Sequence, residues 1–256
     1  GPYEIHPENP LLTSWTGGWP NKPEDVPRHA GTTKLKKAGH ASICEGSGGR
    51  WYLAHLCSRP VADTLSCVLG RETALQEIEW REDGWCYLKQ DGNKPADYIM
   101  AEGAQREVSR EITYHFNDYS FLSDFQTLRI PFDKEYMSIE KRKGYLTLRG
   151  RESIYSRFSQ TLLARRQTDF CFRASAVMEF EPTSFMHMAG LIYRYSEENM
   201  YYLFMSYDET AMKYTINAVE VNDRKYRLLE QKYTASTRLE LILEVREKTG
   251  RFYYVD

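Results

Sequence analysis

The chain has 256 residues, of which 41% are hydrophobic, 27% are charged and 14% are aromatic, and its formal net charge is −2. Such a composition is typical of one or two globular domains. The lack of a basic excess argues against a nucleic-acid partner, and the lack of a long apolar stretch argues against a membrane partner.

The cysteines indicate a reducing environment. Their odd number and the lack of a CxxC spacing argue against a disulfide framework and against a structural zinc site. Cys57 and Cys171 lie inside apolar strand patterns, where a free thiol packs as a small hydrophobic group. We therefore expect a reducing compartment and, because no signal peptide opens the chain, a cytoplasmic location. The five residues are Cys44, Cys57, Cys67, Cys86 and Cys171.

The first hundred residues predict an irregular segment followed by two hairpins. Prolines cluster in residues 1–36, so this segment is expected to be loop. Each hairpin consists of two short apolar runs around a glycine-containing turn. Hairpins repeated at this spacing are typical of β-propeller blades or of a β-sandwich. The expected strands are 39–44, 51–57, 73–80 and 85–88.

The rest of the chain predicts a linker and then a sandwich. Residues 89–110 are polar and are expected to be a linker, and longer, more regular strands are expected from about Ile112. The clearest strand is 170–180, whose apolar side chains alternate with polar ones, as in a half-buried antiparallel strand. A meander of such strands implies a β-sandwich. The further expected strands are 188–195, 200–207, 213–221, 226–233, 239–246 and 251–256.

The last expected strand, Arg251 to Asp256, reaches the final residue without a turn or a polar tail. A sheet that loses part of a strand has an open edge. We therefore expect the sandwich to be incomplete within this chain.

Three ordered segments carry a family resemblance. The first is Lys37 to Ser42 followed by Gly49 to Leu56, and the second is Leu69 to Ala74 leading into Trp80 and Trp85. The third is Phe125 to Pro131, followed by Leu148 to Ser153 and Gln160 to Gln167. Together they resemble the β-xylosidases of glycoside hydrolase family 43, including the bifunctional β-xylosidase/α-L-arabinofuranosidases. The resemblance spans essentially the whole chain.

The resemblance implies an all-β fold, with the last blades of a five-bladed β-propeller followed by an incomplete β-sandwich. Residues 1–100 would be the C-terminal part of the catalytic propeller, and residues 101–256 would be the sandwich. It also implies an inverting exo-glycosidase that releases xylose, or arabinose, from xylo-oligosaccharides. The family's catalytic Asp base, second Asp and Glu general acid would lie upstream of Gly1. We therefore expect no catalytic residue in this chain and no hydrolysis by the chain alone.

Two residues are expected to reach the substrate pocket. By the resemblance, His40 lies at the propeller axis below the active site, and Arg71 reaches the sugar, where a guanidinium can donate paired hydrogen bonds. Glu72 and Thr73 are expected to be structural support. His55 can equally be a core residue, since it alternates with Tyr52 and Ala54 in a strand pattern.

The remaining aromatic and acidic residues of the first hundred are given no catalytic role. Trp15 and Trp19 lie in the irregular segment, where an exposed aromatic ring can line a sugar pocket. Carboxylates in turns are solvated by default, so none in the first hundred residues is assigned a catalytic role. Those carboxylates include Asp25, Glu45, Asp63, Glu72, Asp83 and Asp91.

The resemblance also sets expectations for cofactors and partners. No cofactor is required, although a calcium ion at the propeller axis is compatible with the pattern and would involve His40 indirectly. The substrate would be a xylo-oligosaccharide or an arabinoside, and the enzyme would form homo-oligomers. Two other hypotheses stay open: the sandwich can be a carbohydrate-binding module without catalysis, or a structural and assembly module.

Overall fold

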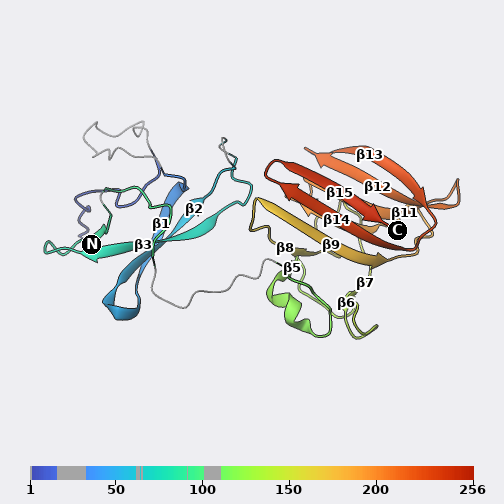
Figure 1. The fold of residues 1–256 in the computed structure, drawn as a ribbon, viewed down its shortest axis with the longest axis horizontal. Coiled ribbons are helices and arrows are strands. Elements are labelled where there is room, and N and C mark those ends of the chain that lie inside the picture. The colour runs from blue at the N-terminus through green and yellow to red at the C-terminus, as the bar shows by residue number, and fades with distance from the viewer. Residues whose placement is uncertain (1, 16–32, 62–63, 65, 91, 101–110) are drawn as a thin grey trace. The chain divides into compact units, whose positions relative to one another are not determined.

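The computed structural model describes residues 2–15, 33–61, 64, 66–90, 92–100 and 111–256. The chain divides into two units, Gly1–Val108 and Ser109–Asp256. Strands dominate both units, and the only helices among the described residues are two short 3-10 turns, η1 (Ser47–Gly49) and η2 (Tyr119–Ser123). The expectation of an all-β fold is confirmed (Figure 1).

The first unit contains one four-stranded antiparallel sheet. Its strands are β1 (Lys36–Glu45), β2 (Trp51–Ser58), β3 (Glu72–Trp80) and β4 (Cys86–Leu88), and they lie side by side in chain order. Both expected hairpins are present, and the pairing of β2 with β3 joins them into one sheet. A four-stranded antiparallel sheet in chain order is the arrangement of a propeller blade.

One face of this sheet forms the core of the first unit. Leu53 of β2 and Ile78 of β3 are buried on it together with Leu88 of β4. The irregular N-terminal segment covers them, because Leu12 packs into the same cluster. His6 secures this segment, since its Nε2 lies 2.8 Å from the carbonyl oxygen of Cys86.

The expected linker at 89–110 is wrong in its first part. Gln90 hydrogen-bonds to Gln76 of β3, and the backbone N–H of Ala96 donates to the same side chain. Asn93 is buried and donates to the carbonyl oxygen of Pro10. Polarity misled the prediction, because these polar groups bond to the protein interior. Residues 101–110 lie outside the described residues.

The second unit begins with a long, mostly irregular arm. Regular strands were expected from about Ile112, but residues 111–169 contain only four short strands, and the expectation is wrong for this stretch. Aromatic side chains such as Phe121 and Phe132 pack against one another here instead of lining a sheet. The short strands are β5 (Phe125–Thr127), β6 (Met137–Ser138), β7 (Thr147–Leu148) and β8 (Leu163–Arg165).

Two larger sheets follow the arm. One has the order β10 (Ala189–Arg194), β11 (Asn199–Asp208), β12 (Lys213–Asn222), β13 (Lys225–Thr234). The other has the order β15 (Thr249–Val255), β14 (Arg238–Arg246), β9 (Cys171–Glu179). The expected meander is therefore wrong after β13, because β14 pairs with β9 and β15 (Figure 1).

A shared apolar cluster holds these two sheets together. Leu203 and Met205 of β11 pack with Ile216 of β12 on one side, and Leu239 and Leu241 of β14 pack on the other. Two sheets with a common core between their inner faces are a β-sandwich. The expected sandwich is confirmed.

The strand at 170–180 shows the predicted alternation. Met178 of β9 and Phe180, just beyond it, pack on the shared cluster, whereas Val177 and Glu179 are exposed. The five cysteine thiols are free; Cys57 is buried as expected, but Cys171 is exposed because it lies on the outer face of β9. No helix among the described residues is long and apolar enough to cross a membrane.

Candidate functional site

The two residues assigned to the substrate pocket lie at the same end of the first unit's sheet. His40 lies in the first half of β1, and Arg71 directly precedes β3. Strand β2 runs between them, with Leu56 paired to both Gly39 and Thr73. From the spacing of strands and the rise per residue, we estimate about 10–15 Å between the two Cα atoms. The pairing thus places both residues at the same end of the sheet, which we call the sheet edge.

His40 occupies a β-bulge. Gly39 pairs with Leu56 and Ala41 pairs with His55, so His40 is the extra residue between two rungs of the ladder. Its φ of 49° lies in the left-handed region, which is uncommon for a residue with a side chain, and Gly39 before it has a φ of 156°. Bulges re-aim a side chain and are frequent beside active sites.

The imidazole of His40 is exposed and makes no hydrogen bond to another of the described residues. A ring nitrogen that is not engaged within the protein can bond to a ligand. A second bulge, between Lys36 and Gly39, precedes this one on β1, and the backbone N–H of Ala38 donates to Ser14 Oγ at 2.9 Å. The irregular segment therefore buttresses the strand that carries His40, and the sequence pattern did not reveal this contact.

Arg71 is exposed, and the Glu72 carboxylate beside it is bonded to Arg59. Glu72 accepts hydrogen bonds from Arg59 Nε and Nη2, the shortest at 2.7 Å. This fork-shaped pair joins the C-terminal end of β2 to the start of β3. Glu72 therefore supports the local structure at this end of the sheet.

His55 is a core residue. It is only 1% exposed, and both ring nitrogens are engaged: Nδ1 with the carbonyl oxygen of Leu56 at 2.8 Å and Nε2 with Gln76 Nε2 at 3.2 Å. Burial lowers the pKa of His55 from its ordinary value, although the hydrogen bond to Leu56 partly opposes this effect. His55 is therefore neutral at physiological pH and does not face a ligand.

The described residues do not provide a cation site. They contain no group of three or more His, Cys, Asp or Glu side chains that could hold a metal ion. Calcium takes six to eight oxygen ligands, which the imidazole of His40 does not supply. The fit between these residues and a protein-ligated calcium is therefore poor.

Besides Glu72, two of the carboxylates named in the sequence analysis, Asp83 and Glu45, lie among the described residues. Asp83 lies in the turn before β4, where it accepts hydrogen bonds from the backbone N–H of Trp85 and from Tyr87 Oη. Glu45 is exposed at the end of β1, far along the strand from His40. Asp25, Asp63 and Asp91 lie outside the described residues.

Trp15 is exposed and anchors Lys94, whose Nζ donates to the Trp15 carbonyl oxygen at 2.5 Å. Burial lowers the pKa of Lys94 below its ordinary value. Trp19, the other aromatic residue assigned to a sugar pocket, lies outside the described residues.

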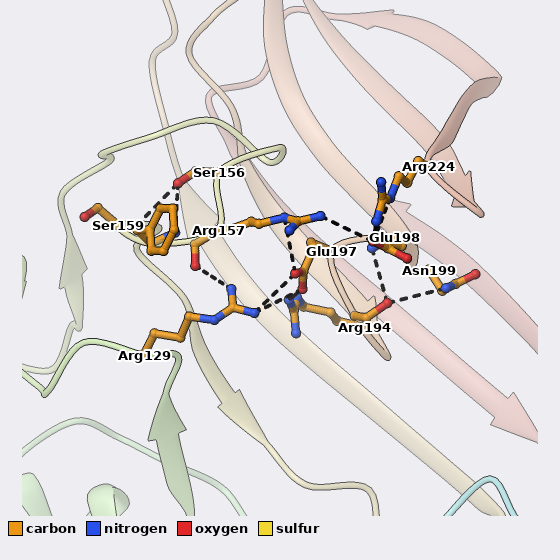
Figure 2. Close-up of polar contacts among 11 residues, drawn as sticks. Arg129, Ser156, Arg157, Ser159, Arg194, Glu197, Glu198, Asn199 and Arg224 are labelled. Carbon is orange, nitrogen blue, oxygen red and sulfur yellow. Dashed lines mark hydrogen bonds and ion pairs between the residues drawn. The ribbon is translucent and has the colours of Figure 1, made fainter.

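The third segment of the family pattern builds structure in the second unit. Its first and last parts pair as β5 and β8, with Gln126 opposite Ala164. Arg129 follows β5 with a φ of 62° and donates to both carboxylate oxygens of Glu197. Glu197 lies in the β10–β11 turn, so the arm is tied to the sandwich (Figure 2).

Further ion pairs extend this contact into what we call the Arg129 network. Arg194 donates to Glu197 at 3.1 Å, and both side chains are less than 20% exposed, at 15% and 18%. The neighbouring Glu198 forms ion pairs with Arg157 and Arg224 (Figure 2). Partly buried charges of this kind are costly to leave unpaired, so the network holds the arm in place. Its members are Arg129, Arg157, Arg194, Glu197, Glu198 and Arg224.

Two protein-family models match the chain. "Glycosyl hydrolases family 43" matches residues 1–86, which contain strands β1 to β3 of the bulged sheet, and "Beta xylosidase C-terminal Concanavalin A-like domain" matches residues 113–255, which contain the sandwich. The fold and the two matches thus place the chain in the propeller-and-sandwich class of glycoside hydrolase families. The chain belongs to glycoside hydrolase family 43, in its β-xylosidase branch.

Similar proteins and solved structures support this family. The chain is 38% identical over 221 residues to the β-xylosidase of Bacillus subtilis, covering 82% of this chain and 38% of that protein. It is 35% identical over 264 residues to xylosidase/arabinosidase 43B of Humicola insolens, covering 99% and 46%. The crystal structure of xylan β-1,4-xylosidase from Bacillus halodurans C-125 superposes with a TM-score of 0.84 at 35% identity, covering 100% and 47%. The chain therefore spans less than half the length of these relatives.

Proposed function

We propose that this chain provides the substrate-binding edge and the accessory sandwich of an inverting exo-glycosidase that releases xylose, with arabinose as a second product, from xylo-oligosaccharides. The carrying observation is that the bulged His40 and Arg71 lie at the same end of one sheet. The relatives named as β-xylosidase and xylosidase/arabinosidase support the substrate class.

In this proposal Arg71 orients the terminal sugar. A guanidinium holds its five donors in a fixed fork, so it can bond two adjacent hydroxyls and select the ring that presents them. His40 adds a donor or an acceptor from the bulge. These residues bind and position the sugar, which lowers the entropic cost of reaching the reactive geometry.

The proposal assigns the acid and the base to residues outside this chain. An inverting glycosidase needs two carboxyl groups about 6.5–9.5 Å apart on opposite sides of the scissile bond. Among the described residues, Glu72 and Asp83 are engaged by Arg59 and Tyr87 respectively. We therefore expect the isolated chain to hydrolyse no xyloside.

A hybrid enzyme tests this function. This chain replaces the matching segment of the Bacillus subtilis β-xylosidase, and hydrolysis of nitrophenyl β-xyloside and α-arabinofuranoside is measured beside the isolated chain. We expect turnover by the hybrid, none by the chain alone, and a loss of at least about 100-fold in kcat/KM on Arg71→Ala, equivalent to about 2.7 kcal/mol. A folded hybrid whose kcat/KM is insensitive to Arg71→Ala, or turnover by the isolated chain, would refute the proposal.

The same hybrid enzyme tests whether a cofactor is required and whether the protein forms oligomers. The proposal includes no required cofactor and a homo-oligomeric enzyme. Activity of the hybrid should survive dialysis against EDTA, and light scattering should give a mass above that of one copy. Loss of activity that calcium restores would show that a cation is needed, and a monomeric mass at working concentration would exclude the oligomer.

A further inference from the structure

A buried polar network includes His55, whose backbone pairs with Ala41 beside the bulge. Gln76 is 0% exposed and uses its whole amide: Nε2 contacts His55 Nε2 and donates to the carbonyl oxygen of Ala96, each at 3.2 Å. Its Oε1 accepts from Gln90 Nε2 at 3.1 Å and from the Ala96 backbone N–H at 2.9 Å. We call these four residues the His55 network. A fully satisfied buried network specifies one arrangement of the groups it joins.

The network determines which nitrogen of His55 carries the proton. The carbonyl oxygen of Leu56 can only accept, so His55 Nδ1 must be the donor across their 2.8 Å contact. Nε2 then presents a lone pair, which accepts an N–H from the Gln76 amide. Both ends of the imidazole thus have a defined role.

His55 also frames the bulge. Its backbone pairs with Ala41, and Leu56 pairs with Gly39, so these two rungs enclose His40. A bulge disrupts the ladder locally, and a left-handed backbone at a non-glycine residue persists only where its surroundings enforce it. The imidazole N–H bonds the carbonyl of one of the two residues opposite the bulge. It therefore acts on the part of the ladder that carries His40.

We propose that His55 is a positioning residue for the sugar-binding edge: its Nδ1–H holds the Leu56 carbonyl, and this contact keeps the His40 bulge in the conformation that faces the sugar with Arg71. This inference rests on the proposed function. His55 itself does not touch the substrate, because it is buried on the core side of the sheet with Leu53 and Gln76.

Two substitutions separate positioning from packing. In His55→Asn the side-chain N–H₂ falls near the position of Nδ1 and can still donate to the Leu56 carbonyl. In His55→Gln the amide reaches towards Gln76 instead and leaves that carbonyl without its ring donor. Both remove the aromatic ring from the core, so a purely structural role predicts similar effects for the two.

The first readout uses the intact 256-residue chain. Its six histidines are labelled, and the ring and amide signals of His40 are recorded by NMR after assignment with His40→Gln. We expect His55→Gln to move the His40 signals and His55→Asn to leave them near their parent positions, with His115 and His187 of the second unit as internal references. Unmoved His40 signals in His55→Gln, or equal movement in both variants, would overturn the inference.

The second readout uses the hybrid enzyme. We expect His55→Gln to raise KM for nitrophenyl β-xyloside about tenfold and His55→Asn to stay within about twofold of the parent, while the two variants unfold at similar temperatures. If Arg71→Ala and His40→Ala lower kcat/KM but the two His55 variants do not differ, only this inference fails. If Arg71→Ala has no effect in the folded hybrid, the proposed function fails as well.

Discussion

The stability of the first unit should depend on one carboxylate in β3. Glu77 accepts hydrogen bonds from Arg50 Nε at 2.9 Å and Nη2 at 2.6 Å, and from Lys89 Nζ at 2.7 Å. Its side chain is 14% exposed. The hydrogen bonds from Arg50 first, and then from Lys89, lower the pKa of Glu77 from 4.5 to about 2.

This pKa sets the size of the expected effect. A pKa difference of one corresponds to about 1.36 kcal/mol, so the fall from 4.5 to about 2 sets an upper bound of about 3.4 kcal/mol. The Lys89 side chain is 56% exposed and solvent screens its share, so we expect about 2 kcal/mol. Because the pKa is lower in the folded state, this stability is present above about pH 4.5 and is lost as the pH falls towards 2.

The perturbation is Glu77→Gln, and the assay is urea unfolding followed by tryptophan fluorescence. The five tryptophans are at positions 15, 19, 51, 80 and 85, so the emission reports only on the first unit. Glu77→Gln should lower the free energy of unfolding by about 2 kcal/mol at pH 7, and the gap should close below pH 4.5.

Glu79→Gln is the matched control for this substitution. It lies two residues further along β3, is 45% exposed and pairs with Arg81, so its loss should stay under about 0.5 kcal/mol. A Glu77→Gln loss as small as that of the control, or one that is unchanged between pH 7 and pH 3, would refute the reasoning.

Three further predictions concern other parts of the chain. Arg129→Ala should destabilise the second unit by about 1–2 kcal/mol, measured by the near-ultraviolet tyrosine signal during unfolding. The control is Arg149→Ala, which removes an exposed ion pair with Glu135 and should cost under about 0.5 kcal/mol. Equal losses would contradict the importance of the Arg129 network. Because burial lowers the pKa of His55, the unfolded state binds a proton first on acidification, and the free energy of unfolding of the first unit should fall below about pH 6.5. His55→Gln should remove this pH dependence. An unchanged pH dependence in the variant would assign it to another group. Burial raises the pKa of the Cys57 thiol, so iodoacetamide should modify Cys44 readily and Cys57 only after unfolding, as mass spectrometry would show; early modification of Cys57 would contradict its burial.

The sequence determined the local features of this protein. Strand periodicity located the hairpins of the first unit and the strands from Phe170 onward, because alternation of apolar side chains is a property of a few consecutive residues. The ordered motifs led to the family and singled out His40 and Arg71. Short polar stretches were less informative, since a polar residue such as Gln90 reads the same whether it faces water or a buried partner.

Only the tertiary structure decided which distant segments meet. Strand β14 pairs with β9, more than fifty residues earlier, although a continuing meander would have served the same pattern. The bulge at His40 follows from the register of β1 against β2, and register depends on both strands at once. The burial of His55 likewise depends on Gln76 and Gln90. The composition of each segment identified the strands. The pairing of the strands placed His40 at an exposed edge and His55 in a buried network.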